Sequence, residues 1–186
     1  MNSRRRVNSN VMRVRTSIKW SVASAVLLLC LAPAALAQPK PPQFQHVKII
    51  IKTDGGPCLC MAGIDASCCP AYFASVNEDG SVKYIGIDGV KVRGEKTHSI
   101  SPSVVRDLVA NFLQINFFSL QDEYRFKKLP DGTTVSIDHS NATTISIDLD
   151  GKQKSVYIFF GAPDELLDLR RNLYEALQIA EYIGRA

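Results

Sequence analysis

Four cysteines lie within twelve residues of this chain and form its densest group of reactive side chains: Cys58, Cys60, Cys68 and Cys69. Thiols at such spacing support three kinds of chemistry. They can be oxidised to disulfides that hold a loop closed, they can bind a soft metal ion as thiolates, or one of them can attack a disulfide in an exchange reaction. Which of the three is expected depends on whether the compartment is oxidising and on the spacing of the cysteines.

The first interpretation is a structural staple. An even number of clustered cysteines is typical of disulfides in an oxidising compartment. Three pairings of the four thiols are possible. Pairing Cys58 with Cys60, or Cys68 with Cys69, would close small and strained rings, so pairing across the loop is favoured while the connectivity stays open. Closing a loop of about a dozen residues stabilises a fold by roughly 3 kcal/mol in the chain-entropy model.

The main alternative is a metal site, because thiolates prefer Cu(I) or Zn(II) and the same four cysteines could surround one ion. Their C-x-C and C-C spacings are not a usual zinc pattern. Thiol–disulfide exchange is a further alternative, but a redox-active pair is usually C-x-x-C at a helix N-terminus, which lowers the pKa of the attacking thiol. The cysteines are therefore predicted to be structural, with no metal and no cofactor.

No other group of residues indicates catalysis. Asp138, His139 and Ser140 have the residue types of a catalytic triad, but neighbouring side chains of an extended segment point to opposite faces, so His139 could not contact both. His46 and His98 lie at predicted strand boundaries, where a solvated or hydrogen-bonded histidine is expected. The sequence has no nucleophile elbow, phosphate-binding glycine loop, zinc-protease motif or calcium loop. We predict that the protein is not an enzyme.

The first 37 residues have the three parts of a secretory signal peptide. Residues 1–19 are basic and contain no acidic residue, residues 21–31 are apolar, and Ala35-Leu36-Ala37 is a small-x-small cleavage site. The apolar segment is about half the roughly 20 residues needed to span a bilayer, which argues against a permanent membrane anchor. We expect an exported protein, periplasmic or secreted after cleavage near Ala37, by the general secretory or the twin-arginine route.

Removal of residues 1–37 would change the charge balance. The whole chain has 22 basic and 18 acidic residues, and six of the basic ones precede residue 38. That leaves 16 basic against 18 acidic residues, a net charge of −2. The basic character of the whole chain therefore indicates neither a nucleic-acid partner nor an anionic membrane.

The remainder is predicted to be a proline-rich spacer over 38–45 followed by one domain over 46–186. Alternating apolar residues, bounded by turn signals, predict its strands. A final hairpin is the clearest of them, because Asp150-Gly151 is a dipeptide that tight turns favour. The predicted strands cover 46–52, 71–76, 82–87, 90–92, 96–100, 143–149 and 155–160.

Two helices complete the pattern. Ser101 is a suitable N-cap for a helix over 102–115, and a second helix begins at Pro163 and ends at Gly184. Each has one apolar stripe that must be buried, while residues 121–132 are polar and predict a loop. The order of strands and helices predicts an α+β fold: an antiparallel sheet, made of a meander and a C-terminal hairpin, with two helices packed on one face.

Several short motifs follow one another along this domain. They are Cys69-Pro70-Ala71-Tyr72, Asp79-Gly80-Ser81-Val82-Lys83-Tyr84, Ile100-Ser101-Pro102, Asn116-Phe117-Phe118-Ser119-Leu120-Gln121-Asp122-Glu123-Tyr124, Asp150-Gly151-Lys152 and Gly161-Ala162-Pro163. In this order the chain resembles the bacterial domain of unknown function family 6438 over roughly residues 47–178.

The resemblance implies no activity, because the family has none established. The family usually has two cysteines three residues apart, the second followed by proline, any residue and tyrosine. By resemblance Cys69 takes the second position and Cys58 or Cys60 the first, with an insertion between them. We therefore predict an exported, non-catalytic, disulfide-stabilised binding or structural module that acts on an unidentified protein partner in the cell envelope. The alternative is a copper or zinc binder.

Overall fold

The computed structural model describes residues 44–55, 69–137 and 141–184. The predicted signal peptide, most of the predicted spacer, three of the four clustered cysteines (Cys58, Cys60 and Cys68) and Asp138, His139 and Ser140 lie outside these residues. None of the helices in the described part combines the length and hydropathy of a bilayer-crossing segment.

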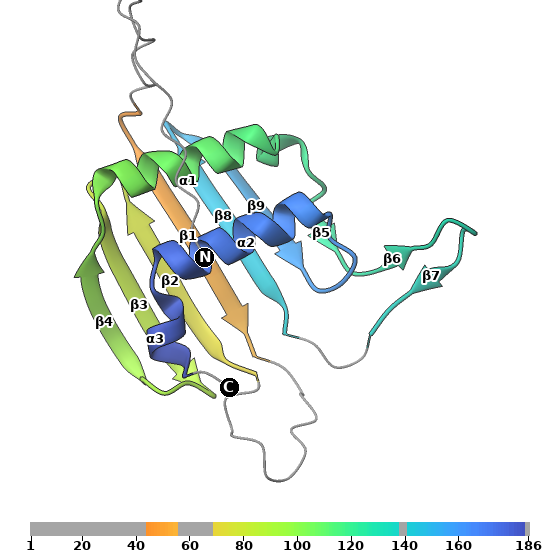
Figure 1. Cartoon of the computed structure of the whole chain (residues 1–186), viewed down its shortest axis with the longest axis horizontal. Coiled ribbons are helices and arrows are strands. Elements are labelled where there is room, and N and C mark those ends of the chain that lie inside the picture. The colour runs from red at the N-terminus through yellow and green to blue at the C-terminus, as the bar shows by residue number, and fades with distance from the viewer. Residues whose placement is uncertain (1–43, 56–68, 138–140, 185–186) are drawn as a thin grey trace, which may run out of the picture. The chain divides into compact units, whose positions relative to one another are not determined.

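In the described part, seven strands form one sheet in the order β4-β3-β2-β1-β8-β9-β5, and two short strands form a separate pair (Figure 1). All neighbours in the large sheet are antiparallel except β5 and β9, which are parallel. The strands of the large sheet are β1 (Val47–Asp54), β2 (Ala71–Asn77), β3 (Ser81–Asp88), β4 (Gly94–Ser99), β5 (Glu123–Tyr124), β8 (Thr143–Leu149) and β9 (Lys152–Ile158); the separate pair is β6 (Lys127–Lys128) and β7 (Thr134–Val135).

The alternation along β1 decides which face of the sheet is covered. Val47, Ile49 and Ile51 are almost fully buried, whereas Lys48 and Lys52 are exposed. Since β1 pairs with β2 on one side and with β8 on the other, the same face continues into buried residues of both neighbours. The β-branched residues of β1 therefore place the core on one side of the whole sheet.

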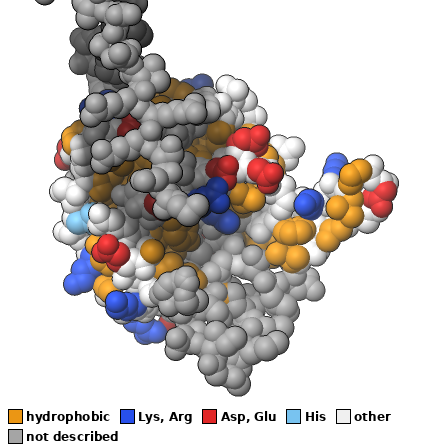
Figure 2. Space-filling view, viewed as in Figure 1, with side chains coloured by type: hydrophobic (Ala, Val, Ile, Leu, Met, Phe, Trp, Pro, Cys, Tyr) orange, Lys and Arg blue, Asp and Glu red, His pale blue; other side chains and the backbone are white. Residues whose placement is uncertain are grey.

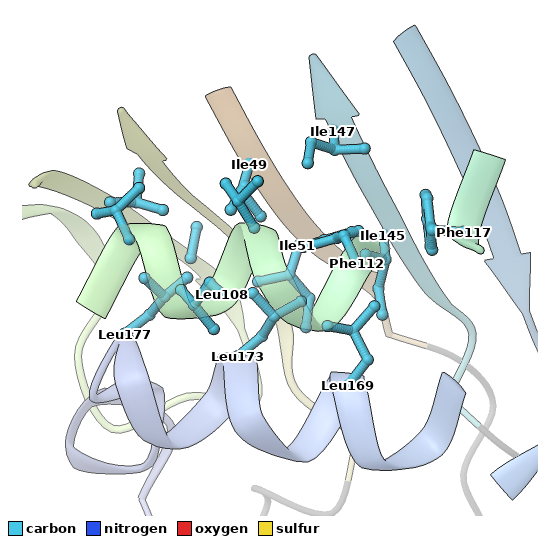
Figure 3. Close-up of a cluster of buried hydrophobic side chains, with 14 of the residues drawn as sticks. Ile49, Ile51, Leu108, Phe112, Phe117, Ile145, Ile147, Leu169, Leu173 and Leu177 are labelled. Carbon is cyan, nitrogen blue, oxygen red and sulfur yellow. The ribbon is translucent and has the colours of Figure 1, made fainter. Parts of the chain in front are cut away.

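Helices α1 (Pro102–Gln114) and α2 (Asp164–Ala176) cover that side of the sheet (Figure 1). Ser101 is the N-cap of α1, and its hydroxyl accepts a hydrogen bond from the backbone N–H of Ser103, as predicted. Between helices and sheet lies a continuous hydrophobic core (Figure 3). Its labelled members are Ile49, Ile51, Leu108, Phe112, Phe117, Ile145, Ile147, Leu169, Leu173 and Leu177. The predicted α+β fold, with helices on one face of an antiparallel sheet, is confirmed.

The prediction of one continuous C-terminal helix is wrong. α2 ends at Ala176, Gln178 adopts a left-handed conformation with φ of 53°, and a short helix α3 (Ile179–Ile183) follows. Apolar periodicity continues through the break, because Leu177 and Ile179 are both buried. The pattern alone therefore could not reveal the change of direction.

Three smaller expectations also need correction. Residues 90–92 are not a strand; the N–H groups of Lys91 and Val92 donate instead to the carbonyls of Ile183 and Tyr182 in α3. The predicted loop over 121–132 contains β5 and β6. The last strand spans Lys152–Ile158 rather than 155–160, because the two-residue turn at Asp150 and Gly151, both with positive φ, lets pairing begin at once.

Gly80 offers a test of the turn between β2 and β3. A Cβ at this position would lie 2.0 Å from the carbonyl oxygen of Ile100, and the φ of Gly80 is +84°. Gly94 has nearly the same φ, +83°, but no atom within 4 Å of its Cβ position. We expect Gly80→Ala to lower the free energy of unfolding by about 3 kcal/mol and the matched control Gly94→Ala by about 1 kcal/mol, measured by denaturant titration. Equal losses would contradict the packing inferred at Gly80.

Candidate functional site

Residues 55–70, called the cysteine segment below, connect the neighbouring strands β1 and β2. Asp54, the last residue of β1, pairs with Ala71, the first residue of β2. A Cβ at Gly55 would lie 3.2 Å from Ala71 Cβ, so the two ends of the segment are side by side. Cys69 is half-buried and lies two residues before the start of β2. The other three cysteines lie outside the described residues, and neither a disulfide pairing nor a thiolate metal site among the four is tested.

Four tyrosines pack together on the helix-covered side, next to these strand ends. Tyr72 and Tyr84, on neighbouring strands, stack with ring centroids 5.9 Å apart. Tyr174 of α2 meets Tyr72 edge-on at 6.0 Å, and Tyr182 of α3 stacks on Tyr84 at 4.7 Å. The cluster joins the broken C-terminal helix to β2 and β3, so the break at Gln178 has a packing consequence: it brings Tyr182 onto the sheet.

Two hydroxyl groups of this cluster, and that of the neighbouring Thr53, are buried. Thr53 Oγ1, Tyr72 OH and Tyr84 OH form no hydrogen bond of regular geometry within the described part of the chain, although Tyr72 OH lies close enough to Thr53 and Tyr174 to interact with both. Burial, with the neighbouring Tyr174 second, raises the pKa of Tyr72 well above its ordinary value and raises the pKa of Tyr84 to about 12. Both phenols are therefore protonated at neutral pH, so they can donate a hydrogen bond but cannot act as bases.

The two histidines that the structure describes belong to different surroundings. His98 of β4 lies beside Tyr182, with 3.2 Å between its Nδ1 and the tyrosine hydroxyl oxygen. His46 precedes β1 and is exposed, with Glu78 Oε2 at 3.8 Å from its Nδ1 and Asp148 Oδ2 at 3.9 Å from its Nε2. A solvated role fits His46, whereas His98 is hydrogen-bonded at Nδ1 and its Nε2 is buried without a partner among the described residues. Among the described residues, no group of three or more His, Cys, Asp or Glu side chains could hold a metal ion.

The other side of the large sheet, which α1 and α2 do not cover, is called the open face below. Its middle carries apolar side chains from three neighbouring strands. Phe73 of β2 lies opposite Ile85 of β3, and Ile50 of β1 lies opposite Ser75 of β2 and Ser146 of β8. Ile50, Phe73 and Ile85 are half-buried by their neighbours rather than fully exposed. The middle of the open face therefore carries a group of apolar side chains, with Lys52 opposite Phe73 and Lys83 opposite Ser75 beside them.

Several charged residues on the open face form ion pairs with one another. Lys83 Nζ lies 2.7 Å from Glu95 Oε2, and Lys52 pairs with Asp54 in the same way. At the β5 edge, Arg125 pairs with Glu123 and its guanidinium lies 4.6 Å from the centre of the Tyr157 ring. Such exposed pairs add little stability. Their effect is to leave a surface without a strong field of either sign.

An open hollow of about 610 Å³ lies where β1, β8 and β9 meet on this face. Several of its polar groups already bond to one another. Gln153 Nε2 donates to Asp148 Oδ2 at 2.7 Å, and the hydroxyls of Ser146 and Ser155 are 2.9 Å apart. Its lining residues are His46, Lys48, Ile50, Ser146, Ile147, Asp148, Gln153, Lys154 and Ser155. The hollow gives the open face a concave region with both apolar and polar contacts.

The open face was missed by sequence reasoning, although a signal for it existed. Ile50 occupies an outward position of β1, where the neighbouring outward residues are Lys48 and Lys52. Phe73 and Ile85 occupy outward positions of their own strands. Such residues indicate a surface with a function only as a group, once their strands are known to be neighbours.

A family model described as "Domain of unknown function (DUF6438)" matches residues 67–177, which is more than half of the 186 residues. The match confirms the family resemblance and contains all of its motifs, although it begins twenty residues after the expected start of the resemblance near residue 47. A search of curated proteins gives no match.

The tyrosine cluster predicts a change of stability in alkali. Above pH 10 the unfolded chain releases its phenol protons while the buried phenols keep theirs, so the unfolded state is favoured as the pH rises towards about 12. Each buried tyrosine can remove up to about 1.4 kcal/mol of unfolding free energy per pH unit. The double variant Tyr72→Phe/Tyr84→Phe should lose stability less steeply than the wild type between pH 10 and 12, measured by denaturant titration.

At neutral pH the same variant should be as stable as the wild type or more stable by about 1 kcal/mol, because it removes buried hydroxyls that make no hydrogen bond of regular geometry. An unchanged alkaline slope, or a clear loss of stability at neutral pH, would contradict this account of the cluster.

Proposed function

The chain belongs to the family described as domain of unknown function DUF6438, and from this starting point we propose a binding function rather than a catalytic one. The protein is an exported, disulfide-stabilised module that binds another protein in the cell envelope through the open face of its sheet. It has no catalytic site of its own and needs no cofactor.

The observation that carries this proposal is the apolar middle of the open face. Antiparallel sheets often leave one face in water, but that face is then mainly polar. Here Ile50, Phe73 and Ile85 lie on three neighbouring strands, and Ile87, further along β3, is 55% exposed. Burying such residues against a partner is favourable, and two of the neighbouring lysines, Lys52 and Lys83, already pair with carboxylates. The partner surface that fits is apolar and uncharged.

The size of the face is compatible with this role. The face is formed by six consecutive strands of the sheet, in the order β4-β3-β2-β1-β8-β9. At about 4.8 Å between strands and about 3.3 Å per residue, strands of this length present roughly 550 Å². A standard protein interface buries about 800 Å² on each partner, so the open face can supply most of one.

The position of the cysteine segment supports a stapling role. Its ends leave β1 and enter β2 as directly paired neighbours. A bridge across the segment would therefore join parts of the chain that the sheet already holds together, without the distortion that makes many disulfides ineffective. Oxidation of the thiols requires export, which the N-terminal sequence predicts.

The thiol state of the exported protein tests the staple and its alternatives together. We expect no free thiol by alkylation and mass spectrometry, at least one bridge between the pair Cys58 and Cys60 and the pair Cys68 and Cys69, and an N-terminus at Gln38. Reduction should lower the free energy of unfolding by roughly 3 kcal/mol. Four free thiols would contradict the staple. Stoichiometric copper or zinc that is lost when the four cysteines are changed to serine would establish the metal-binding alternative.

The binding face can be tested in the producing cell with a photo-crosslinking amino acid. Placed at Phe73, it should form a discrete adduct with a protein. At Leu113, which is 42% exposed on α1 on the other side of the sheet, it should form none. Adduct formation should persist at high salt, because the face has little net charge. Adducts of equal yield at both positions, or at neither, would contradict binding through the open face.

A further inference from the structure

Residues 125–135 form an arm that projects from the β5 edge of the domain (Figure 1). β6 and β7 pair along it, and its tip is a closed turn. There the N–H of Leu129 donates to the carbonyl of Thr133 at 2.8 Å, and the N–H of Thr133 donates to Asp131 Oδ1 at 2.8 Å. Hydrogen bonding from Thr133 also holds the pKa of Asp131 below its ordinary value. The arm is therefore a preformed structure rather than an irregular loop.

The root of the arm is fixed to the sheet. Tyr124 pairs with Ile158 of β9, and its carbonyl accepts a hydrogen bond from the N–H of Phe159 at 2.8 Å. The backbone of the arm passes so close to Gly161 that a Cβ there would lie 2.4 Å from the carbonyl oxygen of Phe126. These contacts hold the arm in a defined direction away from the core.

Apolar and basic side chains gather on the arm (Figure 2). Phe126 is 57% exposed and Leu129 is 37% exposed. Lys127 and Lys128 lie between them, are exposed, and form no ion pair with any described residue. β6 consists of these two lysines alone, and Phe126 and Leu129 flank it on either end.

We propose that this arm binds the surface of an anionic phospholipid bilayer. Phe126 and Leu129 enter the interfacial region, and the ammonium groups of Lys127 and Lys128 meet the lipid phosphates. The domain as a whole has no excess of basic residues, so the attraction is local: Arg125 is paired with Glu123, and the rest of the arm, residues 126–135, contains two basic residues and one acidic residue. Binding is peripheral and reversible, because two apolar side chains anchor a protein far more weakly than a membrane-spanning helix does.

The size of the arm favours a bilayer over a protein partner. Its strands are two residues long, far short of the roughly 800 Å² that each side of a standard protein interface buries. A bilayer requires no complementary pocket, because its interface accepts any exposed apolar side chain flanked by cations. The arm and the open face are separate surfaces, so a negative result for bilayer binding by the arm would not contradict protein binding by the open face, and the reverse also holds.

Vesicle co-sedimentation tests the proposal, using the protein as purified from the producing cell. We expect binding to phosphatidylcholine vesicles that contain phosphatidylglycerol, none to phosphatidylcholine alone, and release at high salt. Lys127→Gln/Lys128→Gln should weaken binding about thirtyfold, since each lysine near an anionic surface contributes about 1 kcal/mol. Phe126→Ser/Leu129→Ser should weaken it at least as much.

Matched controls separate the arm from the rest of the surface. Lys91→Gln/Lys96→Gln removes the same charge from exposed positions outside the arm, and Leu113→Ser removes an apolar side chain that is 42% exposed on α1. Both controls should bind as the wild type does. Absence of vesicle binding, equal binding to neutral vesicles, or equal weakening by the controls and the arm variants would each overturn the proposal.

Discussion

The alternation of side chains along β1 is the constraint on which the rest of this structure depends. β1 is the strand that joins the N-terminal meander to the C-terminal hairpin, because it pairs with β2 on one side and β8 on the other. Its buried residues Val47, Ile49 and Ile51 face the helices. A slip of one residue in either pairing would turn these side chains to the opposite face and break the core against α1 and α2. The register of β1 therefore determines the register of both halves.

The same alternation creates the open face. Because the inward-facing residues of β1 are buried in the core, the residues that alternate with them, Lys48, Ile50 and Lys52, must all face outward. Neighbouring strands in register then bring Phe73 and Ile85 into the same surface. The apolar middle of this face and its paired charges are thus properties of the sheet as a whole. No single strand carries enough exposed apolar area to indicate a binding surface.

Local patterns in the sequence predicted the local structure well. Ser101 and Pro102 marked the start of α1, Asp150-Gly151 marked the tight turn, and the alternation within 46–52 marked β1. What the sequence could not show is pairing between distant segments: β1 beside β8, and β5 parallel to β9. Periodicity reports which side of an element is apolar, but not which element covers it. The open face was missed for the same reason, whereas the arm was missed because its two paired strands are only two residues long.

The order of the strands in the sheet shows which parts of the fold a disulfide bridge in the cysteine segment would connect. The family match begins at residue 67, so Cys68 and Cys69 lie inside it while β1, Cys58 and Cys60 precede it. Yet β1 is an inner strand of the sheet, paired on both sides. A bridge across the segment would covalently fasten this strand to the region that the family model describes, at the end where the two adjoin. Its stabilising effect would therefore act on the pairing that positions the core and the open face together.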